Sequence, residues 1–445
     1  MKKNIVLAKK TLDLRSNKDF ALKLDQVDPL RTFQNEFYQL KDTIYLNGNS
    51  LGLCSSRAET SLIKVKEEWK TLGIHGWLKG NPPWFWFAEQ LAENFAPLMG
   101  AYQDEITVSG STTSNIHNLI ATFYSPGNNR EHLERKTKIL MEASAFPTDI
   151  YAVKSQMKLK GYDPEEHLWF VYPDENGIYQ EQEICHIIEQ YDHDLALIFL
   201  SSVMFTTGQK VDLASLTRAA HDNTIPIGFD LSHSAGIMPH QLHQWGVDFA
   251  TWCNYKWISA GPGATAALFV HRKHHPAKPA FTGWWGHDKN TQFEMNPDFT
   301  PAEGAGTFQQ GTIDMLSAAP LEGALILLNE ARIEAIREKS LAMTGYLIYL
   351  LDQFLEDEKL KIITPINDGS RGGHVAISHP EGFRINQAMK KNGIIADFRS
   401  PETIRLAPSP LYNSFSEVFQ TVKTIREIIE HKTFLNISSK KDPIT

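Results

Sequence analysis

From about residue 100 to residue 275, short apolar runs alternate with longer stretches of helical periodicity. Strands that are apolar throughout are buried on both faces, and such strands separated by helices are typical of a mostly parallel α/β sheet. Ligands of these sheets bind beyond the carboxyl ends of the strands, so the residues that follow each run are the first candidates for a site. We expect strands at 106–108, 138–144, 195–202, 225–230, 249–254 and 265–270.

The two ends of the chain follow other patterns. Residues 16–41 are charged and predict a helix, and no strand-like run precedes 43–53. After Pro320 an amphipathic pattern predicts a long connecting helix from Leu321 to Leu355. The elements expected beyond it are strands at 374–378, 394–399 and 403–408 and helices at 384–392 and 416–432. The expected organisation is an N-terminal arm (1–42), a large domain (43–320), and a connector helix with a small C-terminal α+β domain (321–445).

Length and composition narrow the class of protein. The chain has 445 residues, 42% of them hydrophobic and 22% charged, which is typical of a folded globular protein. Its net charge of −8 provides no positive field for nucleic acid or an anionic membrane, so we expect neither as a partner. No apolar stretch approaches the roughly 20 residues needed to cross a bilayer, and the apolar run 5–8 is too short for a secretory signal. Three scattered cysteines favour a reducing cytoplasm, and we expect no metal site.

The clearest chemical signal lies at the ends of two neighbouring expected strands. One strand ends at Asp230, with His233 three residues further on, and the next is followed by Tyr255 and Lys256. A carboxylate and a lysine at the ends of two parallel strands can converge on one ligand. Pyridoxal phosphate (PLP) needs both, because the amine condenses with its aldehyde and the carboxylate keeps its pyridine nitrogen protonated. The protonated ring then accepts electrons from a carbanion at the substrate's α-carbon.

A phosphate site and a ring-stacking residue are candidates after two other strands. The segment SGSTTSN opens an amphipathic helix, where Thr112 and Thr113 offer hydroxyl and backbone donors to an anion. Serine and threonine are also ordinary helix caps, so this pattern alone leaves a purely structural role open. Phe146 follows the strand 138–144 and either stacks on a cofactor ring or fills the core.

Together, these motifs resemble those of the kynureninase family, which belongs to the fold-type I PLP enzymes and is close to the class V aminotransferases. The similarity runs in order from about residue 43 to residue 432, and GWWGH with LAPSPLYNSF is its most specific part. The resemblance implies a large domain with a mostly parallel seven-stranded sheet flanked by helices. The matching stretches are LNGNSLG (46–52), FPTD (146–149), TTGQ (206–209), GFDLSHSAG (228–236), WGVDFATWCNYKW (245–257), AGPG (260–263), GWWGH (283–287) and RLAPSPLYNSF (405–415).

The resemblance also implies roles for individual residues. Lys256 would bind the cofactor covalently, and Asp230 would pair with the pyridine nitrogen, with His233 beside it. Tyr255 would contact the phosphate and carry protons during catalysis. The other residues implied to hold PLP are Thr112, Thr113, Phe146, Pro147, Thr148, Asp149, Ser201, Trp284 and Thr312, the last two from the second subunit of a homodimer with shared active sites.

A further group would bind the substrate, an aromatic amino acid. Arg405 would hold its carboxylate, because a guanidinium group matches two carboxylate oxygens. His75 and Ser50 would face its aromatic ring, and Asn49 would also bind the substrate. The aromatic-rich segment after His75 is either a wall of that pocket, part of the core or a dimer interface.

The implied reaction is hydrolysis of L-kynurenine, or its 3-hydroxy form, to L-alanine and anthranilate or 3-hydroxyanthranilate. It belongs to the kynurenine pathway, in tryptophan catabolism or NAD biosynthesis. Among the alternatives, a cysteine desulfurase needs a cysteine late in the chain, and none follows Cys253. A class V aminotransferase would share nearly all the cofactor residues. A binding or regulatory protein without turnover would have no use for Lys256, Asp230 and Arg405 together.

Overall fold

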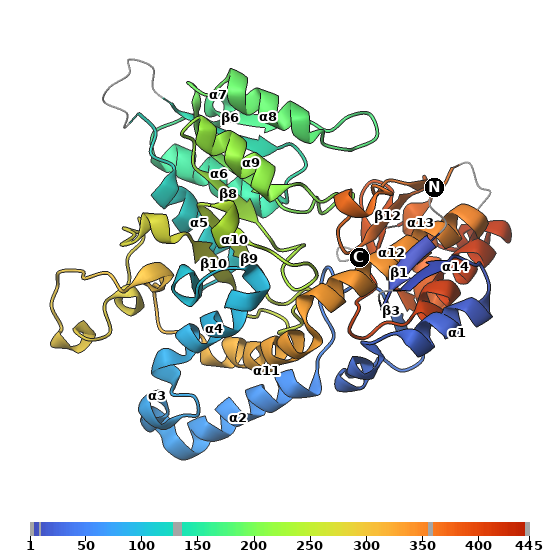
Figure 1. The fold of residues 1–445 in the computed structure, drawn as a ribbon, viewed down its shortest axis with the longest axis horizontal. Coiled ribbons are helices and arrows are strands. Elements are labelled where there is room, and N and C mark those ends of the chain that lie inside the picture. The colour runs from blue at the N-terminus through green and yellow to red at the C-terminus, as the bar shows by residue number, and fades with distance from the viewer. Residues whose placement is uncertain (1–3, 9, 128–135, 355–358, 441–445) are drawn as a thin grey trace.

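The computed structural model describes residues 4–8, 10–127, 136–354 and 359–440. The chain forms a larger α/β half and a smaller α+β half, and the first and last α-helices, α1 (Lys18–Val27) and α14 (Phe415–Glu430), both lie in the smaller half (Figure 1). Leu355, the expected end of the connecting helix, lies outside the described residues. Within the described ranges, every helix is too short or too polar to cross a bilayer.

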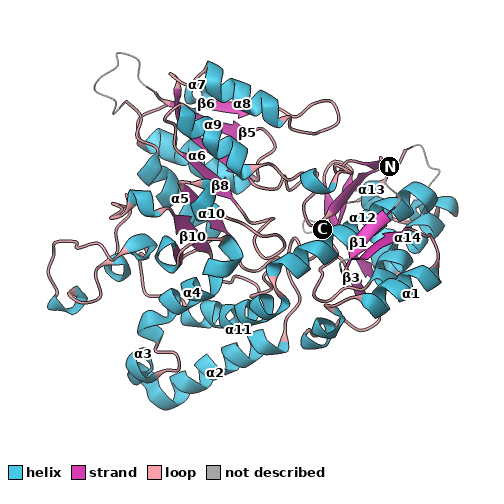
Figure 2. Cartoon of the chain, in the orientation of Figure 1, coloured by secondary structure: helices cyan, strands magenta, loops and turns pink. Residues whose placement is uncertain are grey.

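Seven strands form the central sheet of the larger half, in the order β4-β10-β9-β8-β7-β5-β6. β10 is antiparallel to both of its neighbours, and all other neighbouring pairs are parallel. The expected mostly parallel seven-stranded sheet is therefore confirmed, and Figure 2 shows its strands between helices. The strands are β4 (Ile106–Val108), β5 (Lys138–Glu142), β6 (Leu168–Val171), β7 (Leu195–Ser201), β8 (Ile227–Asp230), β9 (Phe249–Trp252) and β10 (Ala267–Val270).

Alternate residues of these strands enter different hydrophobic clusters. In β7, Ile198 and Leu200 belong to one cluster, whereas Leu197 and Phe199 belong to another. Successive side chains of a strand point to opposite faces, so both faces of the sheet are covered by apolar groups. This double burial is the physical reason for the continuous apolar runs in the sequence.

Helices cover the sheet and extend below it in the view of Figure 1. α2 and α11 pack along each other, and α11 also packs against α4. The helices of the larger half are α2 (Ser56–Leu72), α3 (Gly76–Lys79), α4 (Phe87–Met99), α5 (Thr112–Phe123), α6 (Pro147–Leu159), α7 (Pro164–His167), α8 (Glu181–Gln190), α9 (Leu213–Asp222), α10 (Leu242–Trp245) and α11 (Met315–Ala331).

The smaller half contains a four-stranded antiparallel sheet in the order β11-β12-β15-β14. The hairpin β1-β2 packs on α12, and Ile5 and Phe20 share a hydrophobic cluster with Val375 and Ile404. The N-terminal segment is therefore part of this core. The elements of the smaller half are β1 (Asn4–Leu7), β2 (Lys10–Asp13), α1 (Lys18–Val27), β3 (Ile44–Tyr45), α12 (Ile333–Phe354), β11 (Lys361–Ile362), β12 (Val375–Ser378), α13 (Gly382–Lys391), β13 (Ile394–Ile395), β14 (Asp397–Arg399), β15 (Thr403–Leu406) and α14 (Phe415–Glu430).

Two expected helices are wrong in extent. The helix expected over 16–41 ends at Val27, because Pro29 cannot continue it, and two strands precede it. The connecting helix is two helices, α11 and α12, separated at Arg332, whose φ of 65° lies in the left-handed region. This break lets α11 pack on α2 while α12 packs on α14. Four strands were not expected at all: β1 and β2, which precede α1, and β6 and β11.

A buried ion pair ties the N-terminal segment to α12 and gives the first testable prediction. Lys339 Nζ lies 2.7 Å from Asp28 Oδ2, and the side chains are only 2% and 3% exposed. Lys339→Met leaves a buried carboxylate unpaired, so we expect the free energy of unfolding to fall by about 3 kcal/mol.

Calorimetry should therefore show a clearly lower Tm for Lys339→Met. The matched control is Lys64→Met, whose partly exposed pair with Glu322 should cost less than about 1 kcal/mol. Equal losses in the two variants would contradict the role given to the buried pair.

Candidate active site

Two strands and one helix bring three carboxyl groups to one edge of the large sheet. β5 ends at Glu142 and β8 at Asp230, while β7, the strand between them, ends at Ser201. The Ser201 amide donates to Glu142 Oε1 (3.2 Å), and Ser201 is the register partner of Asp230. Asp149, in the first turn of α6, supplies the third carboxyl group. Glu142, Asp149 and Asp230 are 1%, 1% and 8% exposed, so three acids are buried together.

Burial and repulsion between the carboxyl groups favour protons on Glu142 and Asp149. Burial raises the pKa of Glu142 to about 7, and the charge of Asp230 adds to the effect. Burial, followed by the charges of Asp230 and Glu142, raises the pKa of Asp149 well above its usual range. Asp149 Oδ1 has no hydrogen-bond partner among the described residues. This arrangement suits a cationic ligand atom, which would favour the ionised carboxylates.

Lys256 lies in the turn after β9, within a partly aromatic enclosure. Its Nζ is 3.1 Å from His233 Nε2 and 5.9 Å from the ring centroid of Phe146. Burial, and then the charge of Lys256, lowers the pKa of His233 well below its ordinary value, so this ring is neutral. Phe205 contacts both rings, with centroids 5.5 Å from Phe146 and 6.4 Å from His233. The amine therefore faces a neutral imidazole and an aromatic face.

Tyr255 precedes the lysine and is half-buried. The pKa of its phenol is raised above the ordinary value, mainly by burial, so the phenol keeps its proton at neutral pH. Its carbonyl accepts from the Gly52 amide (2.8 Å), and a Cβ on Gly52 would lie only 2.5 Å from the Lys256 carbonyl oxygen. Glycine is required there by this close approach of two backbones.

Two helix starts lie beside the enclosure. Thr112 is the first residue of α5, and the Thr113 and Thr148 hydroxyl oxygens are 2.8 Å apart. Phe146 caps α6, which begins at Pro147 and packs on α5. The amides of a helix's first turn lack helical partners and attract negative charge, so the start of α5 with its threonines can hold a phosphate.

Arg405 reaches the site from β15 of the smaller half and is 1% exposed. Its Nε donates to Asp397 Oδ2 (2.6 Å), its Nη1 to the Phe205 carbonyl (2.8 Å) and its Nη2 to Ser50 Oγ (3.2 Å). Burial lowers its pKa to about 10, which leaves it charged at neutral pH. Asn49, beside Ser50, is fully buried, and neither polar atom of its side chain has a partner among the described residues. The side-chain amide of Asn49 is therefore available to hydrogen-bond a ligand beside the fixed guanidinium of Arg405.

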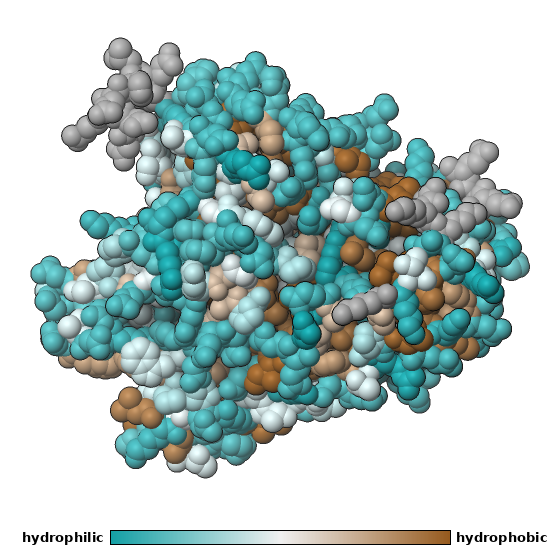
Figure 3. Space-filling view, in the orientation of Figure 1, coloured by the Kyte–Doolittle hydropathy of each residue, from teal (hydrophilic) through white to brown (hydrophobic). Residues whose placement is uncertain are grey.

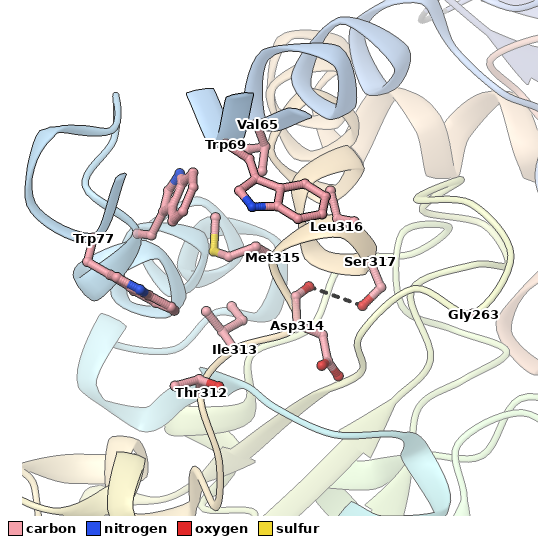
Figure 4. A pocket seen from close by; sticks show the side chains of 11 residues that line it. Val65, Trp69, Trp77, Gly263, Thr312, Ile313, Asp314, Met315, Leu316 and Ser317 are labelled. Atoms are coloured by element: carbon pink, nitrogen blue, oxygen red, sulfur yellow. Dashed lines mark hydrogen bonds between the residues drawn. The ribbon is translucent and has the colours of Figure 1, made fainter. Parts of the chain in front are cut away.

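The structure does not bring every expected residue to this place. His75 is exposed in the turn before α3, which projects away from the sheet in Figure 1. Trp284 is 47% exposed and contacts Trp285. Thr312 lines an open cavity of about 670 Å³ together with tryptophans that include Trp69 (Figure 4). Within the described ranges, none of the three has a hydrogen bond or ring contact with Lys256.

Four residues of the site were missed. Glu142 ends an expected strand, so the rule that pointed to the other strand ends would have found it. Asp397 had a weaker signal in the sequence. It is an acidic residue within a strand, and its partner on the neighbouring strand is the basic residue Arg405. His374 is fully buried 5.9 Å from the His233 ring, with both ring nitrogens lacking partners among the described residues. Nothing in the local pattern singled out Phe205 or His374.

The family model and the curated proteins that match this chain all point to the same family. The kynureninase C-terminal domain model matches residues 336–425. A kynureninase of Shouchella clausii is 48% identical over 427 residues, which cover 96% of this chain and 98% of that protein. A kynureninase of Geobacillus thermodenitrificans is 46% identical over 426 residues, covering 96% and 97%.

Solved structures resemble the fold at much lower identity. A C-DES mutant with glycine covalently linked to the PLP cofactor aligns with a TM-score of 0.76 at 18% identity, covering 88% of this chain and 99% of that one. The apo cysteine desulfurase of Thermococcus onnurineus NA1 aligns with a TM-score of 0.75 at 16% identity, covering 90% and 98%. The expected fold-type I architecture is confirmed.

The raised pKa of Glu142 gives a prediction about stability in protein freed of small ligands. The folded state binds this proton more tightly than the unfolded state, whose glutamate titrates near 4.5. Wild-type stability should therefore fall by up to about 3 kcal/mol as pH rises from about 4.5 to above 7. Glu142→Gln has no carboxyl group to ionise at this buried position. The difference in Tm between this variant and wild type should therefore shift in the variant's favour as the pH is raised from 5 to 8.

The control for that experiment is Glu175→Gln, at an exposed position. It should leave the pH dependence of Tm unchanged. If Glu142→Gln also followed the wild-type curve at both pH values, Glu142 would not hold a proton in the folded state.

Proposed function

The chain belongs to the kynureninase family, and from that premise we propose that it hydrolyses L-kynurenine or 3-hydroxykynurenine. The products are L-alanine and anthranilate or 3-hydroxyanthranilate. Identity of 48% along 96% of the chain supports this activity. The observation that carries the proposal is the placement of Asp230 at the end of β8 and of Lys256 after the neighbouring parallel strand β9, with Lys256 Nζ 3.1 Å from Nε2 of His233, which follows Asp230.

The residues present fit PLP as the cofactor. A protonated pyridine nitrogen would add a positive charge beside the buried carboxyl groups, and Asp230 is the acid proposed to pair with it. His233 Nδ1 and Asp149 Oδ1, both buried, have no partners among the described residues and are free to bind a ligand. Thr112 and Thr113, with Thr148, would hold the phosphate, and Phe146 would cover the ring. When bound, PLP supplies an electron sink for the pairs released as the Cα–H and Cβ–Cγ bonds break.

Proton transfers are assigned to Lys256 and Tyr255. The Lys256 amine would remove the proton at the substrate's α-carbon. Neutral His233, 3.1 Å away, accepts or returns a proton at Lys256 Nζ. Tyr255 keeps its phenol proton at neutral pH, which suits it to donate at the γ-carbonyl oxygen and at Cβ.

Arg405 is proposed to bind the substrate carboxylate. Asp397 fixes the guanidinium from one side, and Phe205 and Ser50 accept from its two terminal nitrogens. The weakly held Ser50 hydroxyl is the partner that a substrate carboxylate would displace, because an anion binds a guanidinium more strongly than a hydroxyl does. Asn49 would then donate to the substrate from its unpartnered amide.

We propose that the enzyme is a homodimer in which each site is completed by the other subunit. Trp69, Ile74, Leu78 and Trp284 are large apolar side chains that are between 47% and 76% exposed. Side chains of this kind are typical of interfaces rather than of free surface. Trp284 and Thr312 would reach the phosphate of the partner's cofactor, and His75 would face the ring of its substrate.

The proposed setting is the cytoplasm, in the kynurenine pathway of tryptophan catabolism. The three cysteines Cys54, Cys185 and Cys253 are free, which suits a reducing compartment.

Loss of the lysine tests the function directly. In Lys256→Ala, we expect no covalently bound PLP, no yellow absorbance from it, and no turnover. The assay mixes enzyme and L-kynurenine without any keto acid and follows anthranilate fluorescence. Wild type should form anthranilate under these conditions. Turnover that requires an added keto acid would indicate an aminotransferase, and unchanged activity of Lys256→Ala would end the proposal.

A second variant tests the carboxylate assignment. Arg405→Leu should weaken kynurenine binding by about 2 to 4 kcal/mol, because a buried charge pair with the substrate is lost. The absorbance of bound PLP should persist, since Arg405 has no proposed contact with it. Normal kynurenine affinity in this variant would show that another group binds the carboxylate.

A further inference from the structure

A second cavity, of about 420 Å³, lies between the two halves of the molecule. Its walls are formed by the segment after β7, the start of α9, the segment around α10, and α12. None of the residues proposed to hold PLP or kynurenine lines it. Much of its lining is apolar and comes from Val211, Leu213, Met238, Trp245 and Leu341. On the face shown in Figure 3, hydrophobic side chains gather mainly on the smaller half and at its border with the larger half.

One wall carries a half-buried cation, Arg337, that forms no ion pair with any acid among the described residues. Within the described ranges, the Arg337 guanidinium donates only to carbonyl oxygens, those of Arg371 (2.6 Å), Gly372 (3.2 Å) and Asp368 (3.3 Å). The carboxylate of Asp368 pairs with Arg371 instead (2.5 Å). Burial lowers the pKa of Arg337 to about 10, so it remains charged at neutral pH. A buried charge of this kind is costly unless an anion compensates it.

Two further polar groups line the same cavity. Within the part of the chain that the structure describes, Lys210 Nζ makes one long hydrogen bond, 3.4 Å to the Gly369 carbonyl. His240 is 2% exposed, and neither ring nitrogen has a hydrogen-bond partner among the described residues. Burial lowers the pKa of His240 to about 4, so its neutral ring offers one donor and one acceptor.

The acids that line the cavity do not cancel these charges. Asp212 is occupied at the start of α9, where its carboxylate accepts from the Ala214 and Ser215 amides and the Ser215 hydroxyl. Asp368 is occupied by Arg371. The cavity therefore presents two cations and an unused imidazole beside an apolar wall.

We propose that this cavity is a binding site for a small carboxylic acid with an apolar body. The carboxylate lies between Lys210 and Arg337, His240 donates a hydrogen bond to it, and the apolar body packs on Leu213, Met238 and Trp245. The volume is in the range of small-molecule sites, which are mostly apolar with a few polar groups that fix orientation. This site is additional to the proposed catalytic site.

Its position connects it to that catalytic site. Lys210 lies on the segment that also carries Phe205, whose carbonyl accepts from Arg405. Arg337 holds the Gly372 carbonyl, two residues before His374, whose ring faces His233. A bound acid would therefore contact two segments that each reach the proposed substrate site.

Calorimetric titration of the PLP-loaded enzyme with benzoate tests the proposal, since benzoate is an apolar-bodied monoanion. Benzyl alcohol lacks the charge and acetate lacks the apolar body, so both should bind at least ten-fold more weakly. The titration is repeated in Arg405→Leu, which disables the proposed substrate site. Benzoate binding should persist there. Because the readout is heat of binding, it does not depend on whether the enzyme turns over kynurenine.

Two variants locate the bound benzoate. Lys210→Met removes one charge, and Leu341→Phe fills the cavity while keeping every charge; each should weaken benzoate binding about ten-fold or more. Lys423→Met, on the exposed face of α14, is the matched control and should bind as wild type does. Binding that disappears in Arg405→Leu but survives both cavity variants would overturn the proposal. Absence of binding heat up to about 10 mM benzoate would overturn it as well.

Discussion

Three acids and one amine share the carboxyl edge of the large sheet, and the rest of the candidate site depends on how their charges balance. Parallel strands end at the same edge, so β5 and β8 place Glu142 and Asp230 close together without any special loop. Burial makes it costly for all the acids to be ionised at once, which is why the pKa values of Glu142 and Asp149 are raised. A cationic ring atom bound beside Asp230 would stabilise the ionised carboxylates, and this attraction would contribute to binding of the ring.

The smaller half completes the site through one arginine. Arg405 projects from β15 and donates to the Phe205 carbonyl of the larger half, so the corner proposed to bind the substrate exists only when the halves pack together. The N-terminal segment supports the same packing, since it joins the core of the smaller half and pairs with α12 through Lys339. The cavity proposed for a second ligand lies along this same border.

The sequence predicts the sheet well because double burial leaves an unmistakable apolar run at most strands. It predicts the extent of helices poorly at Arg332, where a residue that favours helices adopts φ of 65° because its two flanking helices pack on different partners. Among site residues, position after a strand identified Lys256 and Asp230, and the same rule would have identified Glu142. His374 and Phe205 lie in the candidate site because distant segments of the chain pack together there, and no local sequence pattern predicts those contacts.

The central claim is that a single ε-amine, that of Lys256, carries the cofactor at this edge. Reducing the PLP-loaded enzyme with borohydride makes the link permanent, and peptide mapping by mass spectrometry then locates it. The account predicts a pyridoxyl phosphate mass on the peptide that contains Lys256. The same mass on a different lysine, or on no peptide at all, would contradict it.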